Sequence, residues 1–235
     1  MPSQLIVQKD PRSPASESYR TLRTNIEFSS LDKKLNSVVI TSSGPGEGKS
    51  TTISNLALAV ANAGKKVLLV DCDLRKPSLH RKFGVSNQKG LSNILIDQVK
   101  FEDAVINYSH KFDLITSGTI PPNPSEMLSS NKMKNFIKEM EEKYDVLFLD
   151  APPILAVTDA AVLSTMVSGT ILVICSGSTD IEASKKAVEL LKNVKANILG
   201  VVLNKFEKLT SNSYRYKYYY YYGHDGKKEK RKAKR

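Results

Sequence analysis

The sequence predicts an α/β fold, with a mostly parallel sheet and helices on both of its faces. Segments typical of strands alternate with segments typical of helices along most of the 235 residues. Several of the strand segments are uniformly apolar. Such strands are typical of parallel sheets, because helices cover both faces of the sheet. The length and the hydrophobic content of 40% suit one sizeable domain of this class.

The N-terminal part is expected to begin with an arm and continue as a helix. Residues 1–14 contain three prolines and are expected to form an extended arm. Over residues 15–29, the side chains of Tyr19, Leu22 and Ile26 recur at the spacing of one helix face. An amphipathic helix is therefore predicted for this segment.

The following residues alternate between the two kinds of element. Helices are predicted over 51–63, with Gly64 as the C-cap, and over 132–144 and 181–194. Short helical pieces are expected over 78–110, and Ser125 is expected to cap the next helix, with Glu126 in its first turn. Strands are expected at these apolar runs: 37–43, 66–71, 112–118, 144–150, 169–175 and 197–204.

The C-terminal residues 206–235 are expected to form a flexible tail that is basic and rich in tyrosine. Of the net charge of +11, residues 214–235 supply +7, from nine basic and two acidic residues. Such a tail can attract anionic lipid, nucleic acid or an acidic protein surface, or it can be a solvated disordered end. The tail also holds seven of the ten tyrosines: Tyr214, Tyr216, Tyr218, Tyr219, Tyr220, Tyr221 and Tyr222.

The cysteine content indicates the compartment. Cys72 and Cys175 are the two cysteines, far apart in sequence and in apolar surroundings. This argues against a disulfide framework and favours a reducing cytoplasm. No apolar run reaches the roughly 18 residues that span a bilayer, and the N-terminus has no run typical of a signal peptide.

The segment Thr41–Thr51, TSSGPGEGKST, gives the strongest chemical signal. It lies between a predicted strand and a predicted helix, which is the context of a phosphate-binding loop. Backbone N–H groups and the positive end of the helix can cradle phosphate oxygens, and glycine lets the backbone come close. The residues expected to contact the nucleotide are Gly44, Gly46, Glu47, Gly48, Lys49, Ser50 and Thr51.

Three features of this loop bear on its chemistry. Lys49 is expected to reach the β- and γ-phosphates, and the Ser50 hydroxyl is expected to bind Mg²⁺. The usual pattern has glycine where this chain has Ser43, and Gly44 comes one place late.

Carboxylates follow two of the predicted strands. Asp71 ends the strand of residues 66–71, Asp73 lies two residues on, and Asp150 ends the strand of residues 144–150. Ligands bind at the carboxyl ends of strands in open α/β sheets. These acids can support Mg²⁺ and accept a proton from an attacking hydroxyl. Cys72, between two of them, is expected to be a packed residue rather than a ligand.

Taken in order, the loop, Val70–Arg75 (VDCDLR) and Phe148–Pro153 (FLDAPP) resemble the Walker A, A′ and B motifs of the bacterial tyrosine kinases, the BY-kinase family. The resemblance covers residues 15–205, the expected kinase domain. It implies a P-loop NTPase fold related to MinD and ParA, ATP and Mg²⁺ as cofactors, and transfer of phosphate to tyrosine by a non-specific protein-tyrosine kinase.

The resemblance also assigns roles to residues. The expected catalytic residues are Lys49, Asp71, Asp73 and Asp150, with Ser50 on Mg²⁺ and the three aspartates supporting the metal. Asp71 is the expected base and Asp73 a metal support, although the reverse assignment stays open. Asn204, at the end of the last strand, resembles a position near the nucleotide base. Arg75 is expected to pair with a carboxylate rather than to face phosphate.

Self-association and the tail follow from the same resemblance. Glu17, Arg20 and Arg23 match the family's E-x-x-R-x-x-R pattern, which implies a ring-like homo-oligomer such as an octamer. Spacing by three places these side chains on one helix face, available to a neighbouring subunit. The tail tyrosines are the implied phosphate acceptors, modified in trans, and no nucleic-acid partner is expected.

The family further implies a role in the synthesis or export of capsular or extracellular polysaccharide. The implied partners are a transmembrane adaptor that activates the kinase, an opposing tyrosine phosphatase, and sugar-nucleotide enzymes or glycosyltransferases as substrates. The expected location is the cytoplasm, at the inner face of the membrane when the adaptor recruits the kinase.

Two other functions compete with this interpretation. A positioning ATPase of the MinD or ParA kind would use the basic tail to bind membrane or DNA, but those proteins usually carry a lysine where this chain has Gly44. An adaptor module without enzymatic activity would have no use for Lys49, Ser50 and the three aspartates.

Overall fold

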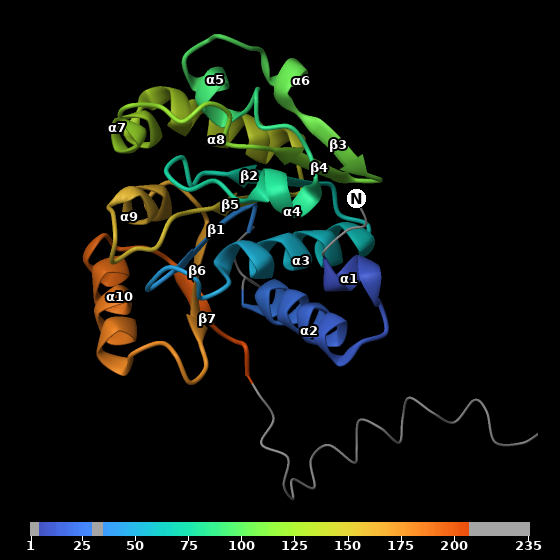
Figure 1. Cartoon of the computed structure of the whole chain (residues 1–235), viewed down its shortest axis with the longest axis vertical. Coiled ribbons are helices and arrows are strands. Elements are labelled where there is room, and N and C mark those ends of the chain that lie inside the picture. The colour runs from blue at the N-terminus through green and yellow to red at the C-terminus, as the bar shows by residue number, and fades with distance from the viewer. Residues whose placement is uncertain (1–4, 30–34, 207–235) are drawn as a thin grey trace, which may run out of the picture.

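A seven-stranded sheet forms the centre of the protein in a computed structural model that describes residues 5–29 and 35–206 (Figure 1). The strand order is β3-β4-β2-β5-β1-β6-β7, with β3 antiparallel to β4 and every other neighbouring pair parallel. This confirms the predicted mostly parallel sheet. The strands are β1 (Ser37–Ser42), β2 (Val67–Asp71), β3 (Ile106–Ser109), β4 (Phe112–Ile115), β5 (Val146–Asp150), β6 (Gly169–Cys175) and β7 (Ile198–Asn204).

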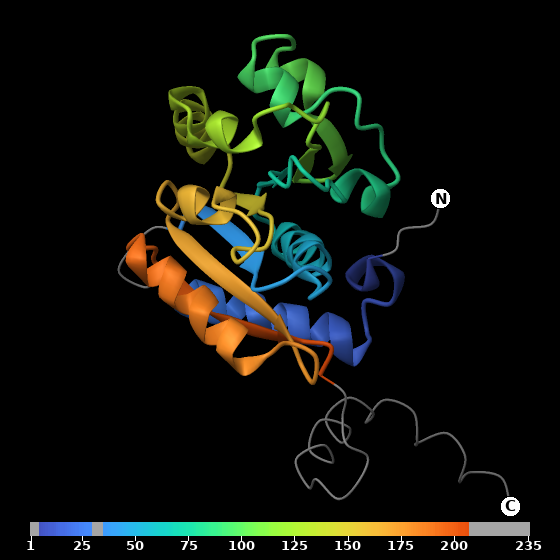
Figure 2. The same ribbon diagram turned by 60° about the vertical axis from the view of Figure 1, so that its left-hand side comes forward.

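Helices cover both faces of the sheet, as the apolar strands predict (Figures 1 and 2). The residues of one apolar cluster lie on α1 (Ile6–Lys9), α2 (Pro14–Phe28), α3 (Lys49–Asn62) and α4 (Leu79–Phe83) and on one face of the strands. The other cluster involves α5 (Leu91–Leu95), α6 (Phe101–Ala104), α7 (Pro124–Ser129), α8 (Asn131–Lys143), α9 (Asp159–Ser164) and α10 (Ile181–Asn193).

Alternate residues of one strand reach opposite clusters. Val38 and Ile40 of β1 belong to the cluster under α3, whereas Val39 belongs to the cluster under α8 and α9, and all three are fully buried. Successive side chains of a strand point to opposite faces of the sheet. Because both faces are covered, β1 needs apolar side chains at consecutive positions.

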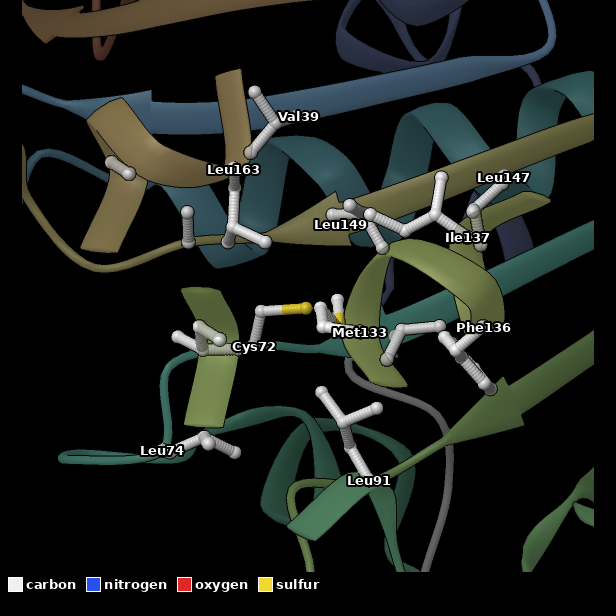
Figure 3. Packing of buried hydrophobic residues seen from close by; sticks show 14 of the residues in the cluster. Val39, Cys72, Leu74, Leu91, Met133, Phe136, Ile137, Leu147, Leu149 and Leu163 are labelled. Atoms are coloured by element: carbon white, nitrogen blue, oxygen red, sulfur yellow. The ribbon is translucent and has the colours of Figure 1, made fainter. Parts of the chain in front are cut away.

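In the segment that ends β2 and follows it, apolar and polar side chains also alternate, with the apolar ones in the core and the polar ones at the edge of the sheet. Cys72 and Leu74 are fully buried in the cluster that also holds Leu91, Met133 and Leu163 (Figure 3). Cys72 is therefore a packed residue, as predicted. The carboxylates of Asp71 and Asp73 hydrogen-bond to backbone N–H groups and to Lys49 instead.

The structure corrects three local expectations. Residues 1–14 are not an extended arm throughout, because Ile6–Lys9 form a helical turn and the adjoining Leu5 and Val7 are buried in the core. Strand β3 was not predicted, since Ile106–Ser109 is short, half exposed and not uniformly apolar. Asn123 rather than Ser125 is the N-cap of α7, because Pro124 takes the first helical position.

Over the described ranges, no helix combines the length and the apolar character that crossing a membrane requires.

Candidate functional site

The predicted site residues converge at the carboxyl ends of parallel strands. The cross-strand register places Asp71 of β2 beside Asp150 of β5, and Asp150 beside Ile40 of β1. The glycine loop follows β1 directly and leads into α3. Parallel strands end at the same edge of a sheet, so the loop and the two carboxylates lie together there.

Two glycines allow the loop to bend sharply into α3. Gly46 and Gly48 have φ angles of 78° and 95°, in the left-handed region that other residues avoid. A Cβ atom on Gly48 would also collide with Asn204 Nδ2. Around Gly46, no heavy atom of the described residues would approach an added Cβ within 4 Å. The loop therefore keeps its backbone open on one side, as a phosphate cradle requires.

Glu47 holds the loop in shape from within the protein. Its carboxylate accepts hydrogen bonds from Ser43 N at 2.9 Å, Ser43 Oγ at 2.7 Å and Thr179 Oγ1 at 2.8 Å. Ser43, which replaces the usual first glycine, does not have a positive φ angle. A serine is thus tolerated there, and its hydroxyl binds a buried carboxylate. Because Ser43 and Thr179 occupy the Glu47 carboxylate, the prediction that Glu47 contacts a nucleotide is left to its backbone.

Asn204 supports the same loop from the end of β7. Its side-chain amide donates to the carbonyl oxygen of Glu47 at 2.8 Å, and Lys205 Nζ donates to that of Gly46 at 3.1 Å. The strand end thus holds the two carbonyls away from the open side of the loop.

Lys49 lies among the acidic residues. Its ammonium is 3.0 Å from Asp73 Oδ2 and 3.4 Å from Asp150 Oδ1, and it donates to Ser50 Oγ at 3.3 Å. Burial alone would lower the pKa of Lys49, but attraction by Asp150 and Asp73 outweighs burial and raises it. The lysine is therefore charged at neutral pH and is held by the acids that are predicted to support the metal.

Asp71 is enclosed by backbone N–H groups. It is fully buried, and its carboxylate accepts hydrogen bonds from the N–H groups of Asp73 at 3.2 Å, Ser78 at 3.0 Å and Leu79 at 2.9 Å. Burial, and then repulsion by Asp150, raise the pKa of Asp71 from 3.8 to about 7, although the bonds from Leu79 and Ser78 oppose the shift. Asp71 thus fixes the start of α4 and titrates near neutral pH.

The donor set fits Mg²⁺. Asp150 is fully buried, and its Oδ2 has no hydrogen-bond partner among the described residues. Burial raises the pKa of Asp150, and Lys49 opposes that effect. In the described part of the chain no three His, Cys, Asp or Glu side chains cluster to hold a metal ion by themselves. Mg²⁺ usually takes one or two carboxylates together with phosphate oxygens and water. The unpaired Asp150 oxygen, Asp73 and the Ser50 hydroxyl match that need.

Arg75 pairs with a carboxylate, as predicted. Its Nε is 3.0 Å from Asp159 Oδ2, and one terminal nitrogen donates to Ser125 Oγ at 2.7 Å. Ser125 Oγ in turn donates to Asp159 Oδ1 at 2.6 Å. These contacts join the segment after β2 to α7 and α9, and Asp159 is fully buried. The sequence did not indicate the roles of Ser125 and Asp159, because the three residues are far apart along the chain.

The sequence also missed Lys82 and Thr179. Lys82, on α4, donates from Nζ to Thr51 Oγ1 at 2.8 Å. It is close enough to the site for Asp150 and Lys49 both to affect its pKa, which burial lowers. Thr179, after β6, donates to the Glu47 carboxylate. Neither belongs to a motif, and only the packing of α4 and β6 against the loop reveals them.

The expected self-association residues are not equivalent. Glu17 and Arg20 form an exposed ion pair at 2.9 Å. Arg23 is half-buried and donates to the carbonyl oxygen of Ala59 on α3 at 3.2 Å. Arg23 is thus engaged within the chain, as Arg20 is through Glu17 and the carbonyl oxygen of Pro11, and contact of the three residues with a neighbouring copy stays a prediction. The predicted phosphate acceptors, Tyr214 to Tyr222, lie outside the described residues.

Comparisons with known proteins agree with this geometry. The model of the ParA family, described as NUBPL iron-transfer P-loop NTPase, matches residues 34–234. Tyrosine-protein kinase YwqD of Bacillus subtilis is 49% identical over 205 residues, which cover 87% of this chain and 86% of that protein. Putative tyrosine-protein kinase CapB of Staphylococcus aureus is 39% identical over 213 residues, which cover 90% of this chain and 93% of that protein.

A solved structure shows the same fold. The kinase domain of the Escherichia coli tyrosine kinase ETK is 33% identical, with a TM-score of 0.86, and the match covers 91% of this chain and 84% of that domain. The sheet, the glycine loop and the strand-end carboxylates define a P-loop NTPase of the ParA class. Within that class, the chain belongs to the bacterial tyrosine-protein kinases.

Proposed function

We propose that this chain is an ATP-dependent protein-tyrosine kinase that phosphorylates the tyrosines of its own tail, residues 206–235, with one copy acting on another. One observation carries the proposal. In a chain of the bacterial tyrosine kinase family, Lys49 and Ser50 of the glycine loop lie against the carboxylates of Asp73 and Asp150, with Asp71 beside Asp150. This set combines a phosphate-binding cation, metal-binding oxygens and a carboxylate that titrates near neutral pH.

Phosphate binding falls to the loop and its lysine. The open backbone around Gly46 would donate N–H groups to phosphate oxygens. A triphosphate in the loop would compete with Asp73 and Asp150 for the Lys49 ammonium, which lies within 3.0 and 3.4 Å of them. Moving the ammonium to phosphate would free carboxylate oxygens at the same moment. Ser50, Asp73 and Asp150 would then hold Mg²⁺, which neutralises charge on the phosphoryl group when bound.

Proton removal from the attacking tyrosine falls to a carboxylate. A phenol has a pKa near 10, so a base is useful at neutral pH. We assign this role to Asp71, because its pKa of about 7 lies close to the operating pH. Asp73, which pairs with Lys49 and is slightly more exposed, is assigned to metal support. Since Asp71 is fully buried and its carboxylate accepts the N–H groups of Ser78 and Leu79, a phenol would reach it only when the start of α4 shifts.

The tail is the proposed substrate because of its composition and attachment. It carries seven tyrosines, and the first, Tyr214, comes eight residues after the last described residue, Phe206. Tethering raises the effective concentration of a substrate at a neighbouring site. The exposed Glu17–Arg20 pair on α2 is proposed to contribute to the assembly that brings copies together.

The test is a phosphate transfer between two variants, one without the catalytic lysine and the other without acceptor tyrosines in the tail. Lys49→Met should abolish tail phosphorylation, because the loop then lacks the ammonium group that is proposed to neutralise the β- and γ-phosphates. A second variant keeps Lys49 and replaces all seven tail tyrosines by phenylalanine. Each variant alone with ATP, Mg²⁺ and the cognate adaptor should incorporate no phosphotyrosine in the tail. Mixed together, they should label the tail of the Lys49→Met copy, as measured by mass spectrometry.

Two results would contradict the proposal. Full tail labelling of Lys49→Met alone would show that Lys49 is not at the active site. No labelling in the mixture, under conditions where wild-type protein labels itself, would exclude transfer between copies.

We also propose the cellular setting that family membership suggests. The kinase would act in the cytoplasm at the inner face of the membrane, recruited and activated by a transmembrane adaptor, and would control synthesis or export of capsular or extracellular polysaccharide. A tyrosine phosphatase would reverse its action, and sugar-nucleotide enzymes or glycosyltransferases would be further substrates. Co-purification of adaptor candidates with the full chain, followed by labelling with ATP, tests this setting.

A further inference from the structure

Lys82 lies beside the phosphate loop, although no motif includes it. It is half-buried on α4, and its Nζ donates to Thr51 Oγ1 at 2.8 Å. Thr51 is exposed and follows Ser50 in the first turn of α3. The ammonium of Lys82 thus reaches the helix start that is proposed to receive phosphate.

The helix that carries Lys82 is held firmly in place. The carboxylate of Asp71 accepts the N–H groups of Ser78 and Leu79 at the start of α4. Leu79 is fully buried, and Phe83 packs edge-on against Tyr108 with ring centroids 4.8 Å apart. Gly84 ends the helix with a φ angle of 67°. The backbone of Lys82 is therefore already positioned, and only its side chain has to be ordered when it binds a ligand.

We propose that Lys82 is a second cation that binds the phosphates of the nucleotide, alongside Lys49. A phosphate oxygen is a stronger acceptor for an ammonium group than the neutral hydroxyl of Thr51, because the hydrogen bond is then charge-assisted. The carboxylates of the site already engage Lys49, whereas Lys82 has a hydroxyl as its acceptor. Lys82 can therefore turn from Thr51 to phosphate without breaking an ion pair.

This inference rests on the proposed function, since it presupposes a nucleotide in the loop. Its test is the affinity of the full-length chain, together with its cognate adaptor, for a non-hydrolysable ATP analogue with Mg²⁺, measured by calorimetry. The variants are Lys82→Met, Lys82→Arg and, as the matched control, Arg81→Met. Arg81 is exposed on the same helix, so its replacement removes the same charge from α4 without removing the contact to the loop.

Lys82→Met is expected to raise the Kd for the analogue by about tenfold or more, the order expected when a charge-assisted hydrogen bond is lost. Lys82→Arg should retain most of the affinity, and Arg81→Met should change the Kd by less than about threefold. The affinity of wild-type protein should also fall more steeply with added salt than that of Lys82→Met. Salt screens the ionic contact between Lys82 and phosphate, and the variant lacks that contact. Thermal unfolding without nucleotide should show that all variants are folded.

Two results would overturn the inference. One is a Kd for Lys82→Met within about twofold of wild type. The other is an equal loss of affinity for the analogue in Lys82→Met and Arg81→Met. That result would show that the net positive charge of α4, and not a contact of Lys82 with phosphate, supports binding. Lys49→Met separates this failure from failure of the proposed function. If Lys49→Met loses binding while Lys82→Met keeps it, the nucleotide site stands and Lys82 is not part of it. If wild-type protein takes up no analogue, the proposed function itself fails.

Discussion

At the scale of single residues, the site depends on carboxylates held away from water. Asp71 and Asp150 are fully buried neighbours across two strands, and Lys49 is the cation between Asp150 and Asp73. When two buried carboxylates lie close to one cation, ionisation of both is unfavourable, and the pKa of at least one of them rises. Burial and the neighbouring Asp150 therefore raise the pKa of Asp71 to about 7. The same environment that suits a base must lower the stability of the fold when Asp71 is ionised.

The pH dependence of stability tests this environment. The pKa of Asp71 is about 7 in the folded chain against an ordinary value of 3.8, so between about pH 4 and pH 7 the folded chain keeps a proton that the unfolded chain has released. The contribution of Asp71 to stability therefore declines as the pH rises through that interval. Asn at this position cannot titrate. The unfolding free energy of wild type minus that of Asp71→Asn should fall from pH 5 to pH 8.

Urea unfolding in EDTA, without nucleotide, measures that difference. Asp71→Asn also turns an amide group toward the N–H groups of Ser78 and Leu79, which adds a penalty that does not depend on pH. The informative result is therefore the change of this free-energy difference with pH, and not its absolute size. A difference that stays constant from pH 5 to pH 8 would show that Asp71 is ionised throughout.

At the scale of elements, the segment between β2 and α4 joins the site to the rest of the molecule. Asp71 and Asp73 belong to the site, Cys72 and Leu74 are buried in the core, and Arg75 reaches Asp159 and Ser125 on α9 and α7. Asp159 is fully buried, whereas the Arg75 side chain is 38% exposed. The two partners of this ion pair therefore differ in what their loss costs.

Replacing Arg75 should destabilise the fold more than replacing Asp159. Arg75→Met leaves the buried carboxylate of Asp159 without its cation and should cost about 2 kcal/mol or more. Asp159→Asn leaves an arginine that water can reach and should cost less. The double variant should be more stable than Arg75→Met alone, because no buried charge remains unpaired. Urea unfolding of the three variants measures these differences, and an Asp159→Asn variant less stable than Arg75→Met would contradict the ion-pair account.

The elements that the sequence predicted correctly are those with a local signal. The strands β1, β2, β5 and β6 are continuous apolar runs, and α8 and α10 show the spacing of an amphipathic helix. The short β3 forms because it pairs antiparallel with β4, so the sequence of its own residues does not predict a strand. Leu5 and Val7 likewise become core residues only because α2 and α3 lie beside them.

The site divides in the same way. Lys49, Ser50 and the three aspartates were predicted, because the loop and the strand ends are contiguous motifs. The pairing of Arg75 with Asp159, the contact of Thr179 with Glu47 and the position of Lys82 span 31 to 132 residues and depend on the packed fold. Sequence patterns thus point to the residues that are proposed to contact the ligand, whereas the residues that hold them in place become visible only in the folded structure.

At the scale of the whole molecule, the positive charge is concentrated in the C-terminal residues 214–235. Of the net charge of +11, residues 214–235 hold +7. Phosphorylation of all seven tail tyrosines would reverse this sign, because each phosphate adds about −1.5 to −2 charges and the tail would reach roughly −4 to −7. A basic tail can be attracted to the acidic site of a neighbouring copy, whereas a phosphorylated tail would be repelled by it. Phosphorylation should therefore favour separation of the copies.

Light scattering after size exclusion tests this consequence on the full chain with its adaptor. Unphosphorylated protein should run as a larger assembly, and incubation with ATP and Mg²⁺ should shift it to a smaller mass as phosphotyrosine accumulates. The variant with all seven tail tyrosines replaced by phenylalanine binds nucleotide but cannot acquire the charge, so its mass should not change. Treatment of the phosphorylated protein with a tyrosine phosphatase should restore the larger assembly. An identical mass for both forms would show that the tail charge does not control assembly, and an equal shift in the phenylalanine variant would assign the change to nucleotide binding instead.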